Sequence, residues 1–184
     1  MKTNRNILTK AFMTAAAACA AYTMYAQSST YKICDRGPAG GWIFYDKGTY
    51  SDGWRYLEAA PENQGRKKWG CQGMSINGAK ATDVGTGMSN TQAIIRGCSE
   101  AGTAARLCIA YRGGGKSDWF LPSKDELYLM LKNLKKCVGR GLAGNRFWSS
   151  SEYNAELGWG KSFGGSQSGG SKFARDQVRA VRAF

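Results

Sequence analysis

The side chains of this chain that are best suited to bind a partner are cationic. Its 184 residues include 26 Lys and Arg against 13 Asp and Glu, and they include no histidine. Without histidine the chain cannot build a Ser-His-Asp or Cys-His catalytic site, a His-ligated zinc site, or the commonest general base near neutral pH. Any catalysis would therefore have to use carboxylates, Cys, Tyr, Lys or Arg. We expect ionic binding by Lys and Arg, with no cofactor and no metal.

Ten basic residues lie in three segments that we expect to be exposed. These segments are a predicted loop region over 61–88 that is rich in Gly, Asn, Gln and Lys, the end of a predicted helix, and a Gly-rich hairpin. The residues predicted to bind an anionic ligand are Arg66, Lys67, Lys68, Lys132, Lys135, Lys136, Arg140, Lys161, Lys172 and Arg175. Solvent exposure alone, or the attraction of cations to a helix C-terminus, would also account for part of this set.

Two tryptophans are candidate platforms for a ligand. Trp69 and Trp159 lie beside Gly-rich loops, where an aromatic face can stack on a sugar or a base. Core packing is the competing interpretation. It is the one we expect for the tryptophans in strand-like strings, which are Trp42, Trp54, Trp119 and Trp148.

Carboxylates and arginines of two distant segments are predicted to pair with each other. Arg179 and Arg182 lie in an otherwise apolar closing strand, so they need partners if they are buried. Asp118 and Glu126 are the natural partners, and we predict a structural ion network. The acid and base of a glycosidase are the alternative, although nothing in the sequence specifies their separation.

Residues 1–26 are typical of a secretory signal peptide. Three basic residues among the first ten precede a short apolar run, and Ala26 offers a cleavage site. Lipoprotein processing at Cys19 is the alternative. Removal of the leader leaves 23 basic and 13 acidic side chains, a net charge of +10. We expect a protein without a membrane span that is secreted or held at the extracytoplasmic cell surface. Its charge suits sulfated or uronic-acid glycans, envelope polyanions or extracellular nucleic acid, unless it serves solubility alone.

Five cysteines remain after the leader, and in an oxidising compartment they are expected to form disulfides. Cys98 and Cys108 lie close in sequence at the ends of two short predicted helices, so we pair them. Cys34, Cys71 and Cys137 stay unassigned.

The elements that position these residues follow from local patterns. Period-two alternation around Asp52-Gly53 predicts a hairpin of strands 42–46 and 54–58. Two short helices are predicted, one opening at Asn90 or Thr91 and carrying Cys98, and one opening at Thr103. A longer helix over 123–137 follows Pro122, with Ser123 and Glu126 as a capping box. Further strands are predicted over 146–151, 157–163 and 177–184, with a hairpin loop over 164–171. The class is a single α+β domain with antiparallel strands.

Five ordered strings are similar to those of the Lcl C-terminal domain, a family named for a bacterial collagen-like surface adhesin. The strings are GPAGGWIFYD (37–46), GWRYLEAAP (53–61), DWFLPSKDEL (118–127), WSSSE (148–152) and VRAVR (178–182). The resemblance covers residues 36–184, after a short N-terminal segment over 27–35. It implies a C-type-lectin-like fold related to that of the formylglycine-generating enzymes. In these strings we predict structural roles for Asp118, Trp119, Pro122, Ser123, Glu126, Trp148, Arg179 and Arg182.

The namesake implies adhesion to sulfated glycosaminoglycans, which agrees with the net charge. The chain departs from it in having no collagenous Gly-X-Y stalk, so a trimer is not implied and we expect a monomer. It also lacks the strings of calcium-dependent sugar sites. We therefore expect an exported, non-catalytic binding module or adhesin for anionic glycans or other polyanions. The alternatives are a component of a cell-surface assembly that binds an envelope protein, and an enzyme, either carbohydrate-acting or a copper-dependent oxidase with reduced Cys98 and Cys108.

Overall fold

The first hairpin closes at Asp52-Gly53, where both residues have positive φ angles, 53° and 82°. This is the geometry of a type I′ turn, which matches the twist of paired strands. The turn joins β1 (Trp42–Ser51) to β2 (Trp54–Ala59), as the sequence alternation predicts. The computed structural model describes residues 30–184, and the predicted signal peptide lies outside them.

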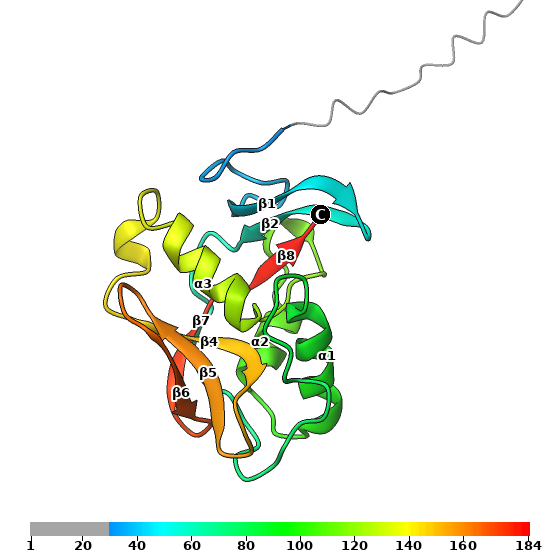
Figure 1. The fold of residues 1–184 in the computed structure, drawn as a ribbon, viewed down its shortest axis with the longest axis vertical. Coiled ribbons are helices and arrows are strands. Elements are labelled where there is room, and N and C mark those ends of the chain that lie inside the picture. Colours follow the sequence, from blue (N-terminus) through cyan, green and yellow to red (C-terminus); the bar gives the residue numbers. More distant parts are fainter. Residues whose placement is uncertain (1–29) are drawn as a thin grey trace, which may run out of the picture. The chain divides into compact units, whose positions relative to one another are not determined.

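The described residues form eight strands and three α-helices, which confirms the α+β class (Figure 1). The other elements are β3 (Gly65–Lys68), α1 (Gly87–Gly97), α2 (Ala104–Ala110), α3 (Lys124–Asn133), β4 (Arg146–Glu152), β5 (Leu157–Ser162), β6 (Gln167–Ser171), β7 (Arg175–Val178) and β8 (Val181–Ala183). Among these helices none has the length and apolar character needed to span a membrane.

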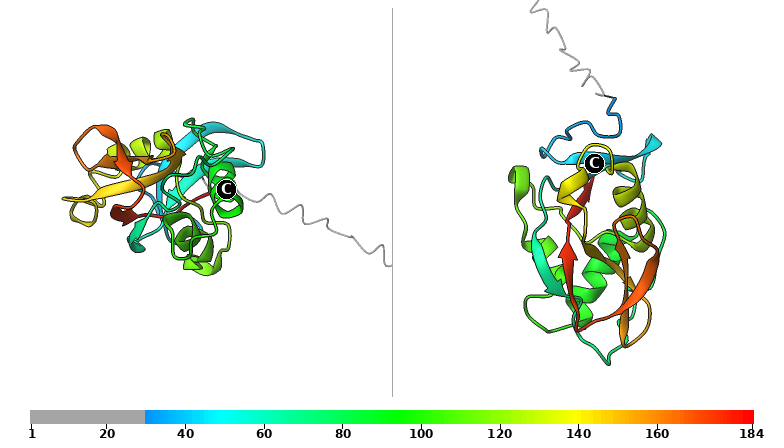
Figure 2. Two further views of the ribbon diagram at one scale, coloured as in Figure 1. Left: turned by 90° about the horizontal axis from the view of Figure 1, so that it is seen from below. Right: turned by 90° about the vertical axis from the view of Figure 1, so that its left-hand side faces the viewer.

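The strands form two sheets. The smaller sheet is antiparallel, with the order β1-β2-β8. The larger sheet has the order β3-β7-β4-β5-β6 and is antiparallel except between β4 and β7. Its two edges are therefore β3 and β6. Seen from below, the orange β5–β6 hairpin and the cyan β1–β2 hairpin lie on opposite sides of the described domain (Figure 2).

Adjacent residues of β4 show which helices cover each face of the larger sheet, because neighbouring side chains of a strand point to opposite faces. Trp148 packs in one core cluster with Ile94 of α1 and Cys108 of α2. Phe147 packs in a second cluster with Leu131 of α3 and with residues of the smaller sheet. The helices α1 and α2 therefore lie on one face, and α3 lies on the other.

Several element boundaries differ from the predicted ones. The helix predicted over 123–137 ends at Asn133, so α3 has 10 residues against 11 in α1, and the prediction that it is the longer helix is wrong. The helix α1 begins at Gly87 instead of at Asn90 or Thr91. The predicted hairpin loop over 164–171 contains β6, and the predicted loop region over 61–88 contains β3. Backbone pairing with a neighbouring strand orders these polar segments, and their side-chain composition does not reveal that pairing.

Arg182 is the centre of a structural ion network. Its Nε and Nη2 atoms donate to the two carboxylate oxygens of Asp118 at 2.8 and 2.7 Å, and its Nη1 donates to Glu58 at 2.8 Å. The contact with Asp118 confirms part of the predicted network, and Arg182 holds the pKa of Asp118 below its usual range. The other part is wrong, since Arg179 donates to Asn63, and Glu126 accepts bonds from backbone N–H groups.

The Gly-rich string over 37–41 closes over the buried Glu58. The N–H of Ala39 donates to the Glu58 carboxylate at 3.1 Å, and a Cβ atom on Gly37 would overlap that carboxylate. Four of the five strings that carry the resemblance thus meet at the Glu58–Arg182–Asp118 network. Their role in the described structure is to hold β2, β8 and the 118–127 segment together.

Glu126 belongs to the capping box that the sequence predicts at the start of α3. Ser123 accepts a bond from the Glu126 N–H, and the Glu126 carboxylate accepts from the Ser123 N–H at 2.7 Å. The carboxylate also accepts from the N–H of Gly85 at 2.8 Å. Glu126 is fully buried, and this burial raises its pKa to about 7 in spite of these donors.

The raised pKa predicts that the protein loses stability as the pH rises from 5 to 8. The folded state keeps a proton on Glu126 up to about pH 7, whereas the unfolded chain loses it near pH 4, so the stabilisation is complete below pH 4 and is lost as the pH passes 7. The free energy of unfolding should fall by up to about 3 kcal/mol across this range. Urea unfolding at both pH values measures the difference, which Glu126→Gln should largely remove. Equal stability of the natural protein at pH 5 and pH 8 would contradict the assignment.

The predicted Cys98–Cys108 disulfide is wrong. The structure joins Cys34 to Cys137 and Cys71 to Cys98, with Cα–Cα distances of 5.9 and 5.8 Å, while Cys108 is a buried free thiol. Cys108 is buried in the core on α2, where burial raises the pKa of its thiol, and Cys98 is bonded to Cys71 of the loop after β3 instead. The loop after β3 can approach the turn between α1 and α2 because it has a glycine at position 70. A Cβ atom on Gly70 would overlap Thr103. With Cys98 in a disulfide, the two reduced thiols that the copper-oxidase alternative requires are not available.

Candidate anionic-ligand site

The predicted basic residues do not form one surface. One group lies between α3 and β5, and it contains Lys132, Lys135 and Lys161. A second group lies on β3 and β7, and it contains Arg66, Lys67, Lys68 and Arg175. In the order β3-β7-β4-β5-β6 the central strand β4 separates β3 and β7 from β5, so the two groups lie toward opposite edges of the larger sheet. Lys136 is exposed but lies outside both groups, and the side chain of Arg140 is outside the part that the structure describes.

The first group is the richer in cationic and aromatic contacts, and we call it the α3–β5 strip. It consists of Lys124, Tyr128, Lys132 and Lys135 from α3 and the turn that follows it, and of Trp159 and Lys161 from β5.

Local geometry puts the two halves of the α3–β5 strip face to face. On α3, Lys124, Tyr128 and Lys132 are spaced by four residues, which places them along one side of a helix. On β5, Trp159 and Lys161 alternate with Gly158 and Gly160, whose α-carbons face the opposite side of the sheet. A Cβ atom on Gly160 would lie 2.6 Å from the Arg146 guanidinium carbon. The small residues thus leave Trp159 and Lys161 to face α3.

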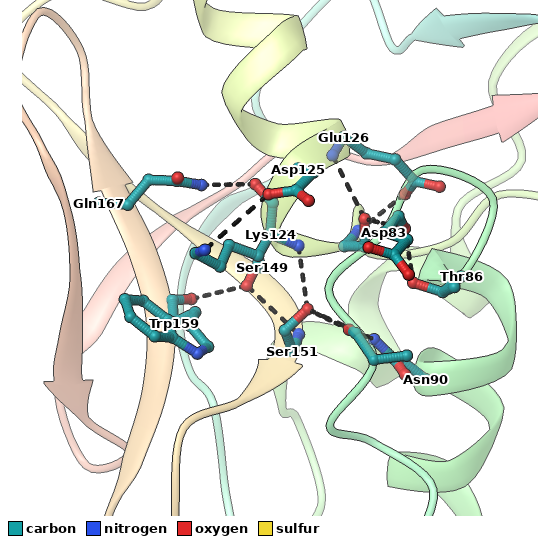
Figure 3. Close-up of polar contacts among 12 residues, drawn as sticks. Asp83, Thr86, Asn90, Lys124, Asp125, Glu126, Ser149, Ser151, Trp159 and Gln167 are labelled. Atoms are coloured by element: carbon teal, nitrogen blue, oxygen red, sulfur yellow. Dashed lines mark hydrogen bonds and ion pairs between the residues drawn. The ribbon is translucent and has the colours of Figure 1, made fainter. Parts of the chain in front are cut away.

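Hydrogen bonds between the start of α3 and the sheet fix this arrangement (Figure 3). The hydroxyl of Ser151 on β4 accepts from the N–H of Lys124 at 2.9 Å, and Gln167 of β6 donates to the Lys124 carbonyl at 2.6 Å. The hydroxyl of Ser149 donates to the carbonyl of Trp159 at 2.9 Å. These bonds hold α3, β4, β5 and β6 in one relative position, so the α3–β5 strip is built on rigid elements.

The lysines of the α3–β5 strip lie over its aromatic rings. Lys124 Nζ is 4.8 Å from the centre of the Trp159 ring, and Lys161 Nζ and Lys132 Nζ are 5.2 and 5.6 Å from the centre of the Tyr128 ring. Such cation–π contacts orient an ammonium group while leaving N–H donors free for an anion. Lys161 also donates to the Gly165 carbonyl. The residue is only 8% exposed, so it lies at the base of the strip.

A cavity of about 180 Å³ lies in the α3–β5 strip. It is lined by Tyr128, Leu131, Lys132, Lys135, Lys161, Gly164 and Gly165. Three ammonium groups beside one exposed ring suit a sulfated or carboxylated sugar, because the charge binds the acidic groups and the ring packs against the apolar side of the sugar. The lining residues offer no paired nucleophile and base.

The positive charge of the second group is partly neutralised by a neighbouring carboxylate. Lys68 lies directly opposite Arg175 in the β3–β7 pair, which is an unfavourable like-charge neighbour. Glu100 reduces this repulsion with an oxygen 3.6 Å from Lys68 Nζ, and the exposed ring of Phe173 lies 4.3 Å from the same atom. A weaker anion site is expected here than in the α3–β5 strip.

Lys172 and Trp69 are not ligand-binding residues, and both predictions are wrong. The Lys172 ammonium is 0% exposed, pairs with Glu152 at 2.7 Å, donates to the Met74 carbonyl at 2.7 Å and lies 4.5 Å from the Trp69 ring centre. Trp69 is buried as well, and its indole N–H donates to the carbonyl of Ser149. The Gly-rich sequence around Lys172 gives no sign of the distant Glu152, which is why the sequence alone suggests exposure.

Tyr128 and Lys124 of the α3–β5 strip are not among the residues that the sequence predicts to bind a ligand. The four-residue spacing of Lys124, Tyr128 and Lys132 was available as a signal, since it places a tyrosine between two lysines on one helix side. The partners on β5 carry no such signal, because their position opposite α3 depends on the sheet order.

Neither a scan against models of protein families nor a search of curated proteins finds a match to this chain.

Proposed function

We propose that this protein is an exported, non-catalytic binding module or adhesin whose α3–β5 strip holds an acidic glycan. The observation that carries the proposal is the cluster of Lys132, Lys135 and Lys161 around the exposed ring of Tyr128. The net charge of +10 outside the predicted leader adds a long-range attraction for polyanions. The two disulfides fit a domain that works in an oxidising compartment.

The similarity of five strings to the Lcl C-terminal domain is part of this proposal. It favours a C-type-lectin-like adhesin that acts at a cell surface or as a secreted protein, in monomeric form. Four of these strings build the structural network around Arg182, and Lys124 is the one strip residue that lies in any of them, so the proposed ligand site rests on the α3–β5 strip and not on the similarity.

Replacement of two strip lysines is expected to weaken binding to heparin. In Lys132→Ala/Lys135→Ala the dissociation constant should rise about tenfold or more at 0.1 M NaCl, and the slope of log K against log salt should fall by about 1 to 2, since two ionic contacts release fewer counterions. Both side chains are exposed, so the fold should be unaffected. Fluorescence anisotropy with a labelled heparin oligosaccharide over a salt series measures both quantities.

The matched control is Arg66→Ala/Arg175→Ala, which removes the same charge from exposed positions on β3 and β7. We expect a change of less than about threefold there, because this charge acts only at a distance. An equal loss in the two double variants would mean that net charge alone binds heparin, and it would overturn the assignment of the site to the α3–β5 strip.

A further inference from the structure

The α3–β5 strip continues past Trp159 onto a second exposed ring, that of Tyr153. Tyr153 directly follows β4 and is 50% exposed. The centre of its ring lies 4.8 Å from that of Trp159, and the two rings are nearly perpendicular, at 77°. Because Lys124 Nζ lies 4.8 Å from the same Trp159 ring, Tyr153 adjoins the strip at its Lys124 end. We call the pair Tyr153 and Trp159 the aromatic corner.

The ring of Tyr153 is held in place although half of the residue is exposed. A Cβ atom on Gly169 of β6 would lie 3.6 Å from Tyr153 Cγ and 3.1 Å from Leu157 Cδ1, so Tyr153 packs over bare backbone beside Leu157. The turn that follows is fixed too, since the carboxamide oxygen of Asn154 accepts from the N–H groups of Glu156 and Leu157 at 2.9 and 2.8 Å. A ring held in this way stacks on a ligand at a low cost in conformational entropy.

The charge of this surface changes along its length. At one end three lysines and Tyr128 line the cavity of the α3–β5 strip. At the other end the turn over 153–157 carries no basic residue and one exposed acid, Glu156. Lys124 and Lys132 lie about 12 Å apart along the helix axis at 1.5 Å per residue, which is longer than one sugar ring. The two ends therefore meet different sugars of one chain, an acidic sugar at the lysines and an uncharged one at the aromatic corner.

We infer that the aromatic corner binds the non-acidic sugar of a mixed glycan, whose apolar face stacks on Tyr153 while a neighbouring acidic sugar lies among the three lysines. Asn154 is exposed, and its carboxamide uses only the oxygen within the turn, so its NH₂ group is available to a sugar hydroxyl. The inference rests on the proposed function and narrows it. A glycan in which acidic and non-acidic sugars alternate satisfies both ends of the surface, whereas a chain of acids alone satisfies only the lysines.

Fluorescence anisotropy with two labelled hexasaccharides tests the inference. One is a hyaluronan hexasaccharide, in which acidic and non-acidic sugars alternate, and the other is an oligogalacturonate of the same length, in which every sugar is acidic. Tyr153→Ala should weaken hyaluronan binding about fivefold or more and change oligogalacturonate binding less than about twofold. Both ligands are measured on the same variant, so a partial loss of folded protein would lower the two signals alike. Tyr153→Phe keeps the ring and should bind hyaluronan within about twofold of the natural protein.

The matched control is Tyr50→Ala, which removes a tyrosine that is 71% exposed on the β1–β2 hairpin, on the other side of the described domain (Figure 2). It should leave both affinities unchanged. An equal effect of Tyr153→Ala on the two hexasaccharides, or no effect on hyaluronan, would overturn the inference, and the proposed function would stand if Lys132→Ala/Lys135→Ala still weakened both. If the lysine variant bound both hexasaccharides as the natural protein does, the proposed function would fail and the inference with it.

Discussion

Lys172→Met is expected to lower the free energy of unfolding by about 3–5 kcal/mol, because it breaks a buried ion pair and leaves Glu152 as an uncompensated charge. Glu152 also accepts the N–H of Ile76 at 2.8 Å and the hydroxyl of Ser75 at 3.0 Å, so the pair anchors the segment before α1 to the sheet. Methionine fills much of the space of the lysine stem, and the loss is therefore one of charge and hydrogen bonds more than of volume. Urea unfolding followed by tryptophan fluorescence measures the effect.

The control for Lys172→Met is Lys132→Met on the exposed side of α3. It removes the same charge without a buried partner, and it should change the stability by less than about 0.5 kcal/mol. We expect the opposite order for heparin binding, which Lys132→Met should weaken more than Lys172→Met does, since Lys132 is in the α3–β5 strip and Lys172 is not. A loss below about 1 kcal/mol in Lys172→Met would show that the lysine is not the buried partner of Glu152.

Removal of the Cys34–Cys137 disulfide is the second change with a large expected effect. The bridge spans 103 residues and ties the segment before β1 to the turn after α3. A crosslink over a loop of this length reduces the entropy of the unfolded chain by an amount worth about 4–5 kcal/mol, and measured losses for natural disulfides are about 2–5 kcal/mol. We expect Cys34→Ser/Cys137→Ser to lose stability within the measured range in the same urea assay.

The second disulfide provides the comparison. Cys71–Cys98 spans 27 residues, so Cys71→Ser/Cys98→Ser should lose about 1 kcal/mol less than the other pair. Mass spectrometry of the natural protein under non-reducing conditions should give these two pairs with Cys108 as a free thiol. Detection of a Cys98–Cys108 crosslink instead would refute the pairing.

The parts of the fold that the sequence predicts correctly depend on local signals. The Asp52-Gly53 turn and the Ser123–Glu126 capping box are set by residues a few positions apart, and both are confirmed. The errors share another cause. β6 consists of Gln, Ser and Gly, and only its pairing with β5 makes it a strand. Local composition carries no information about that pairing.

The candidate site shows the same division. The helical half of the α3–β5 strip could have been found from its four-residue spacing. The burial of Lys172 could not, because its partner Glu152 is 20 residues away and meets it only through the fold. The Cys98–Cys108 prediction failed for a related reason, since nearness in sequence does not determine which cysteines the fold brings together, and it brings the more distant Cys71 to Cys98. Asp118–Arg182 succeeded because a carboxylate stabilises a buried guanidinium and the fold brings Asp118 to Arg182, whereas Arg179 is given only the amide of Asn63.

The measurement that tests the binding surface most directly is a titration of ¹⁵N-labelled protein with a heparin tetrasaccharide, followed by amide NMR at physiological salt. We expect the largest shift changes on the residues of the α3–β5 strip and the adjoining turn, which are Lys124, Tyr128, Lys132, Lys135, Trp159, Lys161, Gly164 and Gly165. The amides of β3 and β7 should change little. Changes concentrated on Lys67, Lys68 and Arg175, or spread evenly over the surface without a focus between α3 and β5, would contradict the claim that the α3–β5 strip is the binding site.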